Sequence, residues 1–187
     1  LNVIDKPTII KCKGKSYTKI SFKPDYARLG YKDGLPKDML RMFKRRVYDI
    51  AAVTDKKIKV KWNSTVIEVK NFQQYVSKYI GSKTDTRRVY ESLDDRWEYE
   101  VCMSPTGEFR QVSFVNGIFT SKGGKHVDHV LTKIVNKIVA IAKAKKIVIT
   151  ASSVKEQLWL FLRCDIENPS FDSQTKDYMS TSALNFG

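Results

Sequence analysis

The sequence predicts an α+β fold that combines a mostly antiparallel sheet with amphipathic helices, one of them a long crossover helix. Several short segments alternate apolar and polar residues, which is the pattern of half-buried strands. Longer segments repeat apolar residues at helical spacing. Near the end of the chain, the unbroken apolar run Leu158–Leu162 has the length of a strand.

The composition predicts a soluble globular chain. Of its 187 residues, 42% are hydrophobic, which is enough for a core in one large domain or two small ones. No apolar run approaches the roughly 20 residues that span a bilayer, and the N-terminus lacks a secretory pattern, so we expect no membrane partner. Three distant cysteines (Cys12, Cys102 and Cys164) and two histidines predict neither a disulfide framework nor a metal site, and they fit an intracellular protein.

The net charge of +14 is concentrated in the first half of the chain. Residues 1–92 contain 22 Lys and Arg against 9 Asp and Glu, whereas residues 93–187 contain 12 against 11. A strongly basic surface favours a polyanion such as a nucleic acid, because phosphate neutralisation releases counterions. General solubility is the competing interpretation of the same charge.

The sequence pattern of residues 1–51 predicts one strand and one helix. Residues 1–16 are polar and without periodicity, and they lead into residues 17–22, which alternate as a strand until Pro24. Pro36 stands where a helix can begin. Apolar residues then recur at helical spacing as far as Ala51, and basic residues between them take the solvent side.

A hairpin and a second helix follow. Residues 58–62 and 65–69 flank an Asn-Ser turn, and lysines line the outer face of the first of these segments. Asn71 can cap a helix with one apolar stripe, and Gly81 is placed to end it. Edge lysines also prevent strand aggregation, so this basic face is weak evidence for a binding site.

A domain boundary is predicted between residues 92 and 93, because residues 82–95 lose periodicity and gain polar residues. The two predicted domains are therefore residues 1–92 and residues 93–187. In the second domain, residues 97–103 alternate as a strand, and residues 109–115 return as its partner after a Ser-Pro-Thr-Gly turn.

Two adjacent glycines precede a long helix from Val127 to about Lys145, and apolar residues repeat on its buried side. This helix is predicted to be the crossover. Residues 147–150 resume strand character, and a capping box at Ser153–Glu156 indicates a short helix. The apolar run 158–162 then closes the sheet.

The chain next reaches a Pro-marked turn and the polar tip Gln174-Thr175-Lys176. Lys176 offers three hydrogen-bond donors and a full positive charge, and Gln174 and Thr175 add neutral donors beside it. Such a tip can hold a terminal phosphate. An exposed polar turn is the alternative interpretation of these three residues alone.

A second candidate site is a lysine cluster at the end of the long helix. From His129 to Lys155 there are six lysines and no acid. The helix dipole favours cations at a C-terminus, so a structural role and DNA contact are equally open from the residues alone. The lysines concerned are Lys143, Lys145 and Lys146. His126, in the turn before the helix, is predicted to be structural.

Five stretches of the sequence together resemble one protein family. They are Lys44–Ala51, Arg96–Glu98, Gln111–Gly117, Ser121–Val127 and Ile166–Lys176. In this order and spacing they are similar to the type IIA DNA topoisomerases, in the eukaryotic form rather than the gyrase form. The divergent, lysine-rich sequence suggests a viral member of the family.

The resemblance implies that residues 1–92 form the end of a GHKL-type ATPase α/β sandwich. It implies that residues 93–187 form a transducer domain carrying the Gln-Thr-Lys loop. The cofactors would be ATP and Mg²⁺, with the magnesium ligands outside this chain. Lys176, as a catalytic and cofactor-binding residue, would contact the γ-phosphate with Gln174 beside it. Hydrolysis would then let the transducer rotate and close a dimeric DNA gate through which one duplex passes another.

The resemblance also implies partners and location. Double-stranded DNA would be contacted by Lys143, Lys145 and Lys146, and the full-length enzyme would be a homodimer, located in the host cytoplasm if viral and in the nucleus if cellular. The family's residues for ATP hydrolysis and DNA cleavage are missing here, so this chain alone is not expected to be catalytically competent. Another GHKL-class ATPase and a non-enzymatic nucleic-acid-binding protein are the alternatives.

Overall fold

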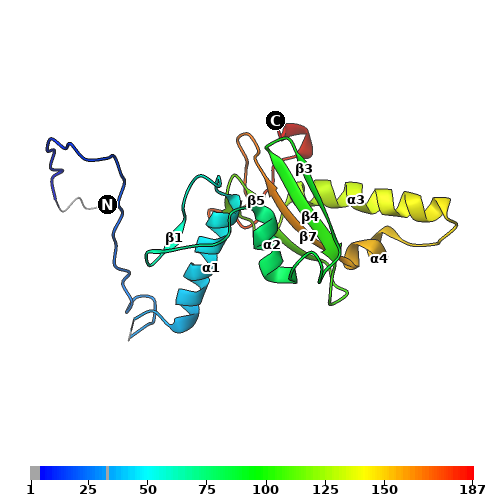
Figure 1. Ribbon diagram of the computed structural model, residues 1–187, viewed down its shortest axis with the longest axis horizontal. Helices are drawn as coiled ribbons and strands as arrows, with labels where there is room; N and C mark the ends of the chain where they lie inside the picture. Colours follow the sequence, from blue (N-terminus) through cyan, green and yellow to red (C-terminus); the bar gives the residue numbers. More distant parts are fainter. Residues whose placement is uncertain (1–4, 33) are drawn as a thin grey trace. The chain divides into compact units, whose positions relative to one another are not determined.

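The computed structural model describes residues 5–32 and 34–187 (Figure 1). The chain divides into two units, residues 1–37 and residues 38–187. Within residues 5–32 the first unit contains turns at residues 26–30 but neither helix nor strand. The second unit contains the sheet and all the elements that position the candidate sites.

The strand predicted at residues 17–22 does not form, so this prediction was wrong. Tyr17, Ile20 and Phe22 are 83%, 83% and 85% exposed. A strand needs a neighbour that satisfies its backbone groups and a surface that covers its apolar side. Residues 5–32 provide no second strand, and alternation of side chains cannot replace one.

The second unit is a five-stranded sheet with helices on both faces, together with a small separate hairpin (Figure 1). Its elements are, in chain order, α1 (Lys37–Val53), β1 (Lys61–Trp62), β2 (Thr65–Val66), α2 (Phe72–Ile80), β3 (Arg88–Leu93), β4 (Trp97–Met103), β5 (Arg110–Val115), β6 (Ile118–Phe119), α3 (Lys125–Ala144), α4 (Ala151–Glu156), β7 (Leu158–Cys164) and the 3₁₀ turn η1 (Ala183–Asn185). The order in the sheet is β3-β4-β7-β5-β6.

The predicted fold class is confirmed. The β3–β4, β4–β7 and β5–β6 pairings are antiparallel, and β5 pairs in parallel with β7. A parallel pairing requires a long crossover, which α3 and α4 supply between β6 and β7. The sheet is therefore mostly antiparallel with one long crossover helix.

The local signals for the hairpin and for α2 are confirmed as well. The β1–β2 turn has positive φ angles of 46° at Asn63 and 68° at Ser64, as a type I′ turn requires. The Asn71 side chain caps α2 by accepting a hydrogen bond from the Gln74 backbone N–H at 2.8 Å. Gly81 ends the helix with a φ of 79°.

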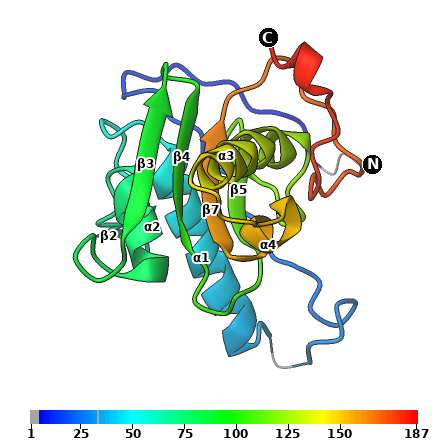
Figure 2. The same ribbon diagram turned by 90° about the vertical axis from the view of Figure 1, so that its right-hand side faces the viewer.

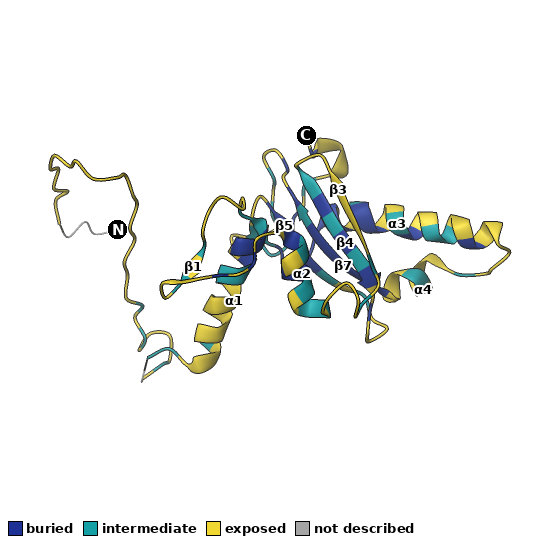
Figure 3. Ribbon diagram, in the orientation of Figure 1, coloured by how far each residue is buried: buried dark blue, intermediate teal, exposed yellow. Residues whose placement is uncertain are grey.

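Strand β7 is the centre of the sheet, and its side chains alternate between two cores. Trp159 and Phe161 pack in the core that includes residues of α1 and α2. Leu158, Leu160 and Leu162 pack in the core that includes α3. Because helices cover both faces, the run is apolar at every position rather than alternating. Figure 2 shows α3 nearly end-on in front of the sheet, and Figure 3 shows the buried residues gathered in the central strands.

The predicted pairing of residues 97–103 with residues 109–115 was wrong, although both segments are strands. Strand β7 lies between them, pairing antiparallel with β4 and parallel with β5. A short turn favours a hairpin locally, but a strand that is apolar on both faces is most stable in the middle of a sheet. The non-local burial of β7 therefore overrides the local turn signal.

Three smaller differences concern the ends of the sheet and its connections. Residues 147–150 form no strand, and Val148 is 97% exposed. The capping box of α4 begins three residues earlier than predicted: Thr150 Oγ1 accepts from the Ser153 N–H at 3.1 Å, and Ser153 Oγ accepts from the Thr150 N–H at 3.2 Å. Strand β3 was not predicted, because it is a largely exposed edge strand without an apolar face.

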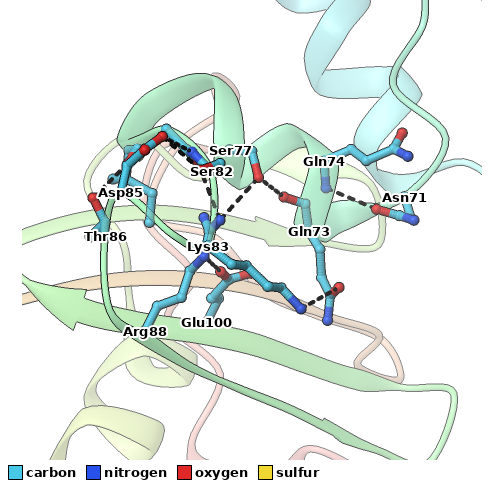
Figure 4. A network of polar contacts seen from close by, with 12 residues as sticks. Asn71, Gln73, Gln74, Ser77, Ser82, Lys83, Asp85, Thr86, Arg88 and Glu100 are labelled. Carbon is cyan, nitrogen blue, oxygen red and sulfur yellow. Dashed lines mark hydrogen bonds and ion pairs between the residues drawn. The ribbon is translucent and has the colours of Figure 1, made fainter.

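A network of polar contacts fixes the connection between α2 and β3 (Figure 4). Arg88 on β3 donates from Nη2 to the carbonyl of Gly81 at 3.2 Å and to Ser77 Oγ at 3.3 Å. Its Nε lies 2.9 Å from Oε1 of Glu100 on β4, and both side chains are buried.

The predicted boundary between residues 92 and 93 lies inside the second unit, near the end of β3. The division into residues 1–92 and 93–187 stays a prediction.

Candidate functional site

The loop that follows β7 is held at its base and along its two limbs. The Asn116 side chain donates to the Ile166 carbonyl at 2.9 Å and accepts from the Ile166 N–H at 2.8 Å. Farther along, the Asp172 N–H donates to the Tyr178 carbonyl, and the Ser180 N–H donates to the Ser170 carbonyl. The loop is thus a hairpin-like projection whose tip is residues 173–177.

The tip is a closed turn. The Lys176 N–H donates to the Ser173 carbonyl at 3.0 Å, and Lys176 has a positive φ of 59°. The hydroxyl groups of Ser173 and Thr175 lie 2.9 Å apart. Gln174 is exposed on the same turn. Lys176 is half-buried. The structure therefore brings Gln174 and Lys176 together on one turn.

The Lys176 side chain contacts an aromatic ring rather than an acid. Its ammonium group lies 5.7 Å from the centroid of the Phe171 ring, a cation–π contact worth about 0.5–1 kcal/mol at an exposed site. Among the described residues, no carboxylate forms an ion pair with it. An anion that approaches the tip therefore meets no competing carboxylate on the lysine.

Sequence reasoning missed the acid that follows the tip. Asp177 accepts hydrogen bonds from Ser121 Oγ at 2.6 Å and from Thr175 Oγ1 at 2.8 Å. These two hydrogen bonds lower the pKa of Asp177, and the positive charges of Lys122 and Arg46 act in the same direction. A carboxylate directly after a candidate phosphate-binding lysine was the sequence signal that could have identified this residue.

The loop is also joined to the N-terminus of α3. The Met179 N–H donates to the Gly123 carbonyl at 3.1 Å, and the Lys125 N–H donates to the Met179 carbonyl at 2.9 Å. Gly124, with a φ of 143°, lies so close that a Cβ there would be 2.4 Å from the Met179 carbonyl oxygen. Glycine is needed at this position because the two backbones touch.

His126, on the first turn of α3, is fully buried. Burial lowers the pKa of its imidazole to about 4. Its Nε2 lies 3.2 Å from Thr120 Oγ1. A neutral, buried imidazole agrees with the structural role predicted for His126 and offers no charge to an external phosphate.

The lysine cluster lies at the other end of α3. Lys143, Lys145 and Lys146 are exposed where the helix ends, in a segment that projects beyond the sheet (Figures 1 and 3). The helix has 20 residues, which corresponds to a length of about 30 Å. The lysine cluster and the Lys176 loop are therefore separate sites at opposite ends of one helix.

The described part of the chain contains neither a metal-binding cluster nor a membrane-spanning helix. Within residues 5–32 and 34–187, no group of three or more His, Cys, Asp or Glu side chains could hold a metal ion. None of the helices there combines the length and the apolar character that a membrane crossing demands.

Comparison with known proteins gives the family. Residues 49–186 match the DNA gyrase B family. The chain is 41% identical to DNA topoisomerase 2 of Arabidopsis thaliana, a match that covers 97% of this chain and 13% of the relative. It is 43% identical to DNA topoisomerase 2-alpha of Cricetulus griseus, where the match covers 93% of this chain and 12% of the relative.

A solved structure agrees with these relatives. The ATPase region of Saccharomyces cerevisiae topoisomerase II superimposes with a TM-score of 0.81 at 39% identity, over 89% of this chain and 42% of that chain. The chain therefore belongs to the DNA gyrase B family of type II topoisomerase ATPase regions. Within that family, it is a part of the ATPase region of the eukaryotic type. It spans about an eighth of the length of the curated relatives.

Proposed function

We propose that this chain is part of an ATP-dependent type II DNA topoisomerase and that Lys176, with Gln174 beside it, contacts the γ-phosphate of ATP. The nucleotide would be held by the ATPase domain that precedes the sheet in the same protein. The observation that carries this proposal is a closed turn that holds Gln174 exposed beside the half-buried Lys176, whose ammonium group has no carboxylate partner in the described part of the chain. Relatives named DNA topoisomerase 2 support it.

The chemistry of phosphoryl transfer explains why such a residue matters. Bound ATP supplies a γ-phosphoryl group whose transfer depends on positioning and on stabilisation of negative charge. Lys176 places a full positive charge there from the transducer. Once the γ-phosphate has left, Lys176 loses its anionic partner, and the loop and the helix joined to it can take another position. The proposed consequence is movement of the transducer, which couples nucleotide state to closure of a DNA gate.

Further parts of the proposal concern the whole enzyme. The exposed Lys143, Lys145 and Lys146 would contact the phosphates of double-stranded DNA. The enzyme would act as a homodimer that passes one duplex through another, and its Mg²⁺ ligands would lie outside this chain. The lysine-rich sequence is our reason for also proposing a viral source. The protein would be located in the host cytoplasm if it is viral and in the nucleus if it is cellular.

The test is DNA-stimulated ATP hydrolysis by a polypeptide extended upstream through a complete nucleotide domain. Lys176→Ala is expected to lower the rate while nucleotide binding is retained. Removing one charged donor from a phosphoryl-transfer site costs on the order of 2–4 kcal/mol, or roughly 30- to 1,000-fold.

The matched control is Lys137→Ala, which removes the same charge from an exposed position on α3. This variant is expected to hydrolyse ATP at the wild-type rate. Equal rates for wild type and Lys176→Ala would refute the proposed role of Lys176. An equal loss in both variants would show that the net charge of the chain, rather than the position of Lys176, sets the rate.

A further inference from the structure

Asp177, next to Lys176, makes three hydrogen bonds, one within the tip and two that tie the tip to the rest of the fold. Its Oδ1 accepts from Ser121 Oγ at 2.6 Å, and its Oδ2 accepts from Thr175 Oγ1 at 2.8 Å. Its backbone carbonyl accepts from the Lys122 N–H at 2.9 Å. Each of its three oxygen atoms therefore has a separate partner.

These contacts connect two distant parts of the sequence. Ser121 and Lys122 belong to the turn that leads into α3, and Ser121 is 56 residues away from Asp177. The neighbouring Met179 extends the connection, because its N–H and carbonyl bond to Gly123 and Lys125. The limb of the loop that follows Lys176 is consequently attached to the start of α3 over residues 177–179.

The orientation of the Asp177 carboxylate matters for Lys176. An acid beside a lysine could pair with it and neutralise the ammonium group. Here the two carboxylate oxygens are taken up by the hydroxyl groups of Ser121 and Thr175, and Asp177 forms no ion pair with Lys176. Hydrogen bonds from hydroxyl donors stabilise an ionised carboxylate, so the acid holds its place without using the lysine.

We propose that Asp177 is a positioning residue for the γ-phosphate contact, with Ser121 as its anchor on the body of the transducer. Its contacts fix the residues on both sides of Lys176, since Asp177 is held by Ser121 and Thr175 is held by Asp177. The ammonium group is therefore presented to the phosphate from a rigid turn. This inference rests on the proposed contact between Lys176 and ATP.

A positioning role predicts a specific kinetic effect. Ser121→Ala removes the anchor without altering the tip. Asp177→Ala removes both side-chain hydrogen bonds of Asp177 but keeps the backbone bond to Lys122. In the extended polypeptide, each is expected to lower kcat for ATP hydrolysis by roughly 10- to 100-fold, because small displacements of a catalytic group cost rates of that order. The KM for ATP should change less than about twofold, since the nucleotide domain holds the rest of the nucleotide. Ser121→Thr keeps the hydroxyl donor and should restore wild-type kcat.

A double-variant cycle separates positioning from general stability. If Asp177 acts through Lys176, then Asp177→Ala should cause no further loss in a Lys176→Ala background. A loss of the same factor in both backgrounds would overturn the proposal, and so would a wild-type kcat in Ser121→Ala and Asp177→Ala. A wild-type rate in Lys176→Ala alone would refute the phosphate contact itself. That result differs from a wild-type rate in Ser121→Ala and Asp177→Ala, which would refute only the positioning role.

Amide hydrogen exchange on the 187-residue chain gives a second measurement that needs no nucleotide domain. In Ser121→Ala, the amides of Lys122 and Lys176 should exchange faster, whereas amides of the central strand β7 should exchange at the wild-type rate. Uniformly faster exchange would show a general loss of stability and overturn the positioning role. Unchanged exchange at Lys176 would show that the hydrogen bond between Ser121 and Asp177 does not order the tip.

Discussion

Replacing Arg88 by Met is expected to destabilise the chain strongly, because Arg88 is the cation paired with the buried carboxylate of Glu100. The side chains are 3% and 0% exposed, and Arg88 Nε lies 2.9 Å from Glu100 Oε1 (Figure 4). In the described part of the chain, neither oxygen of Glu100 accepts a well-aligned hydrogen bond. Breaking a buried pair by removing one partner costs about 3–5 kcal/mol, because the other charge is left uncompensated.

The pH dependence of this variant follows from the same environment. Burial raises the pKa of Glu100, and the positive charge of Arg88 opposes that rise. Without Arg88 the pKa in the folded state rises further above the unfolded value of about 4.3. Folded Arg88→Met then binds a proton that the unfolded chain does not, so the destabilisation should shrink as the pH falls from 7 towards 5.

Urea unfolding of the 187-residue chain is the assay, with Arg88→Met compared with the double variant Arg88→Met, Glu100→Leu. The double variant should recover most of the stability that the single variant loses, because a buried pair replaced by apolar residues of similar volume is often neutral. Arg41→Ala is the control, since it breaks an exposed pair with Asp38, and it should leave the midpoint unchanged. A loss below about 1 kcal/mol in Arg88→Met, or a double variant as unstable as the single one, would refute the reasoning.

Three other predictions concern α3 and its ends. Burial lowers the pKa of His126 to about 4. Below pH 6.5 the unfolded chain therefore binds a proton at His126 that the folded chain does not bind, and the free energy of unfolding should fall by about 3 kcal/mol between pH 6.5 and 4. His126→Gln should flatten this pH dependence, measured by urea unfolding at each pH. Gly124→Ala forces Cβ against the Met179 backbone and should cost about 1–3 kcal/mol or more by thermal unfolding, whereas Gly123→Ala, whose Cβ would meet atoms no nearer than 3.5 Å, should cost less. Replacing Lys143, Lys145 and Lys146 by Ala should weaken duplex binding and flatten its salt dependence by about 0.9 for each DNA phosphate that is no longer neutralised; an unchanged slope would place the DNA-binding surface elsewhere.

The parts of the fold that could be predicted from sequence are those with local causes. Asn71 and Gly81 end α2 where their side-chain and backbone chemistry requires, and the spacing of apolar residues gives α1 and α3. The sheet order could not be predicted, because β7 is brought between β4 and β5 by burial on both faces. The segment 17–22 shows the opposite failure, in which a strand-like pattern has no partner to pair with.

The candidate site shows the same distinction between residues with local causes and residues placed by the fold. Gln174, Thr175 and Lys176 are consecutive, so their shared capacity to meet a phosphate can be read from the sequence without knowledge of the fold. The contact that holds them is not local, because Ser121 reaches Asp177 only after α3, α4 and β7 have brought residues 56 positions apart together. Residues that touch a ligand can be found from their chemistry, whereas residues that orient them depend on topology. A survey of this loop by substitution should therefore include the turn before α3 as well as the motif itself.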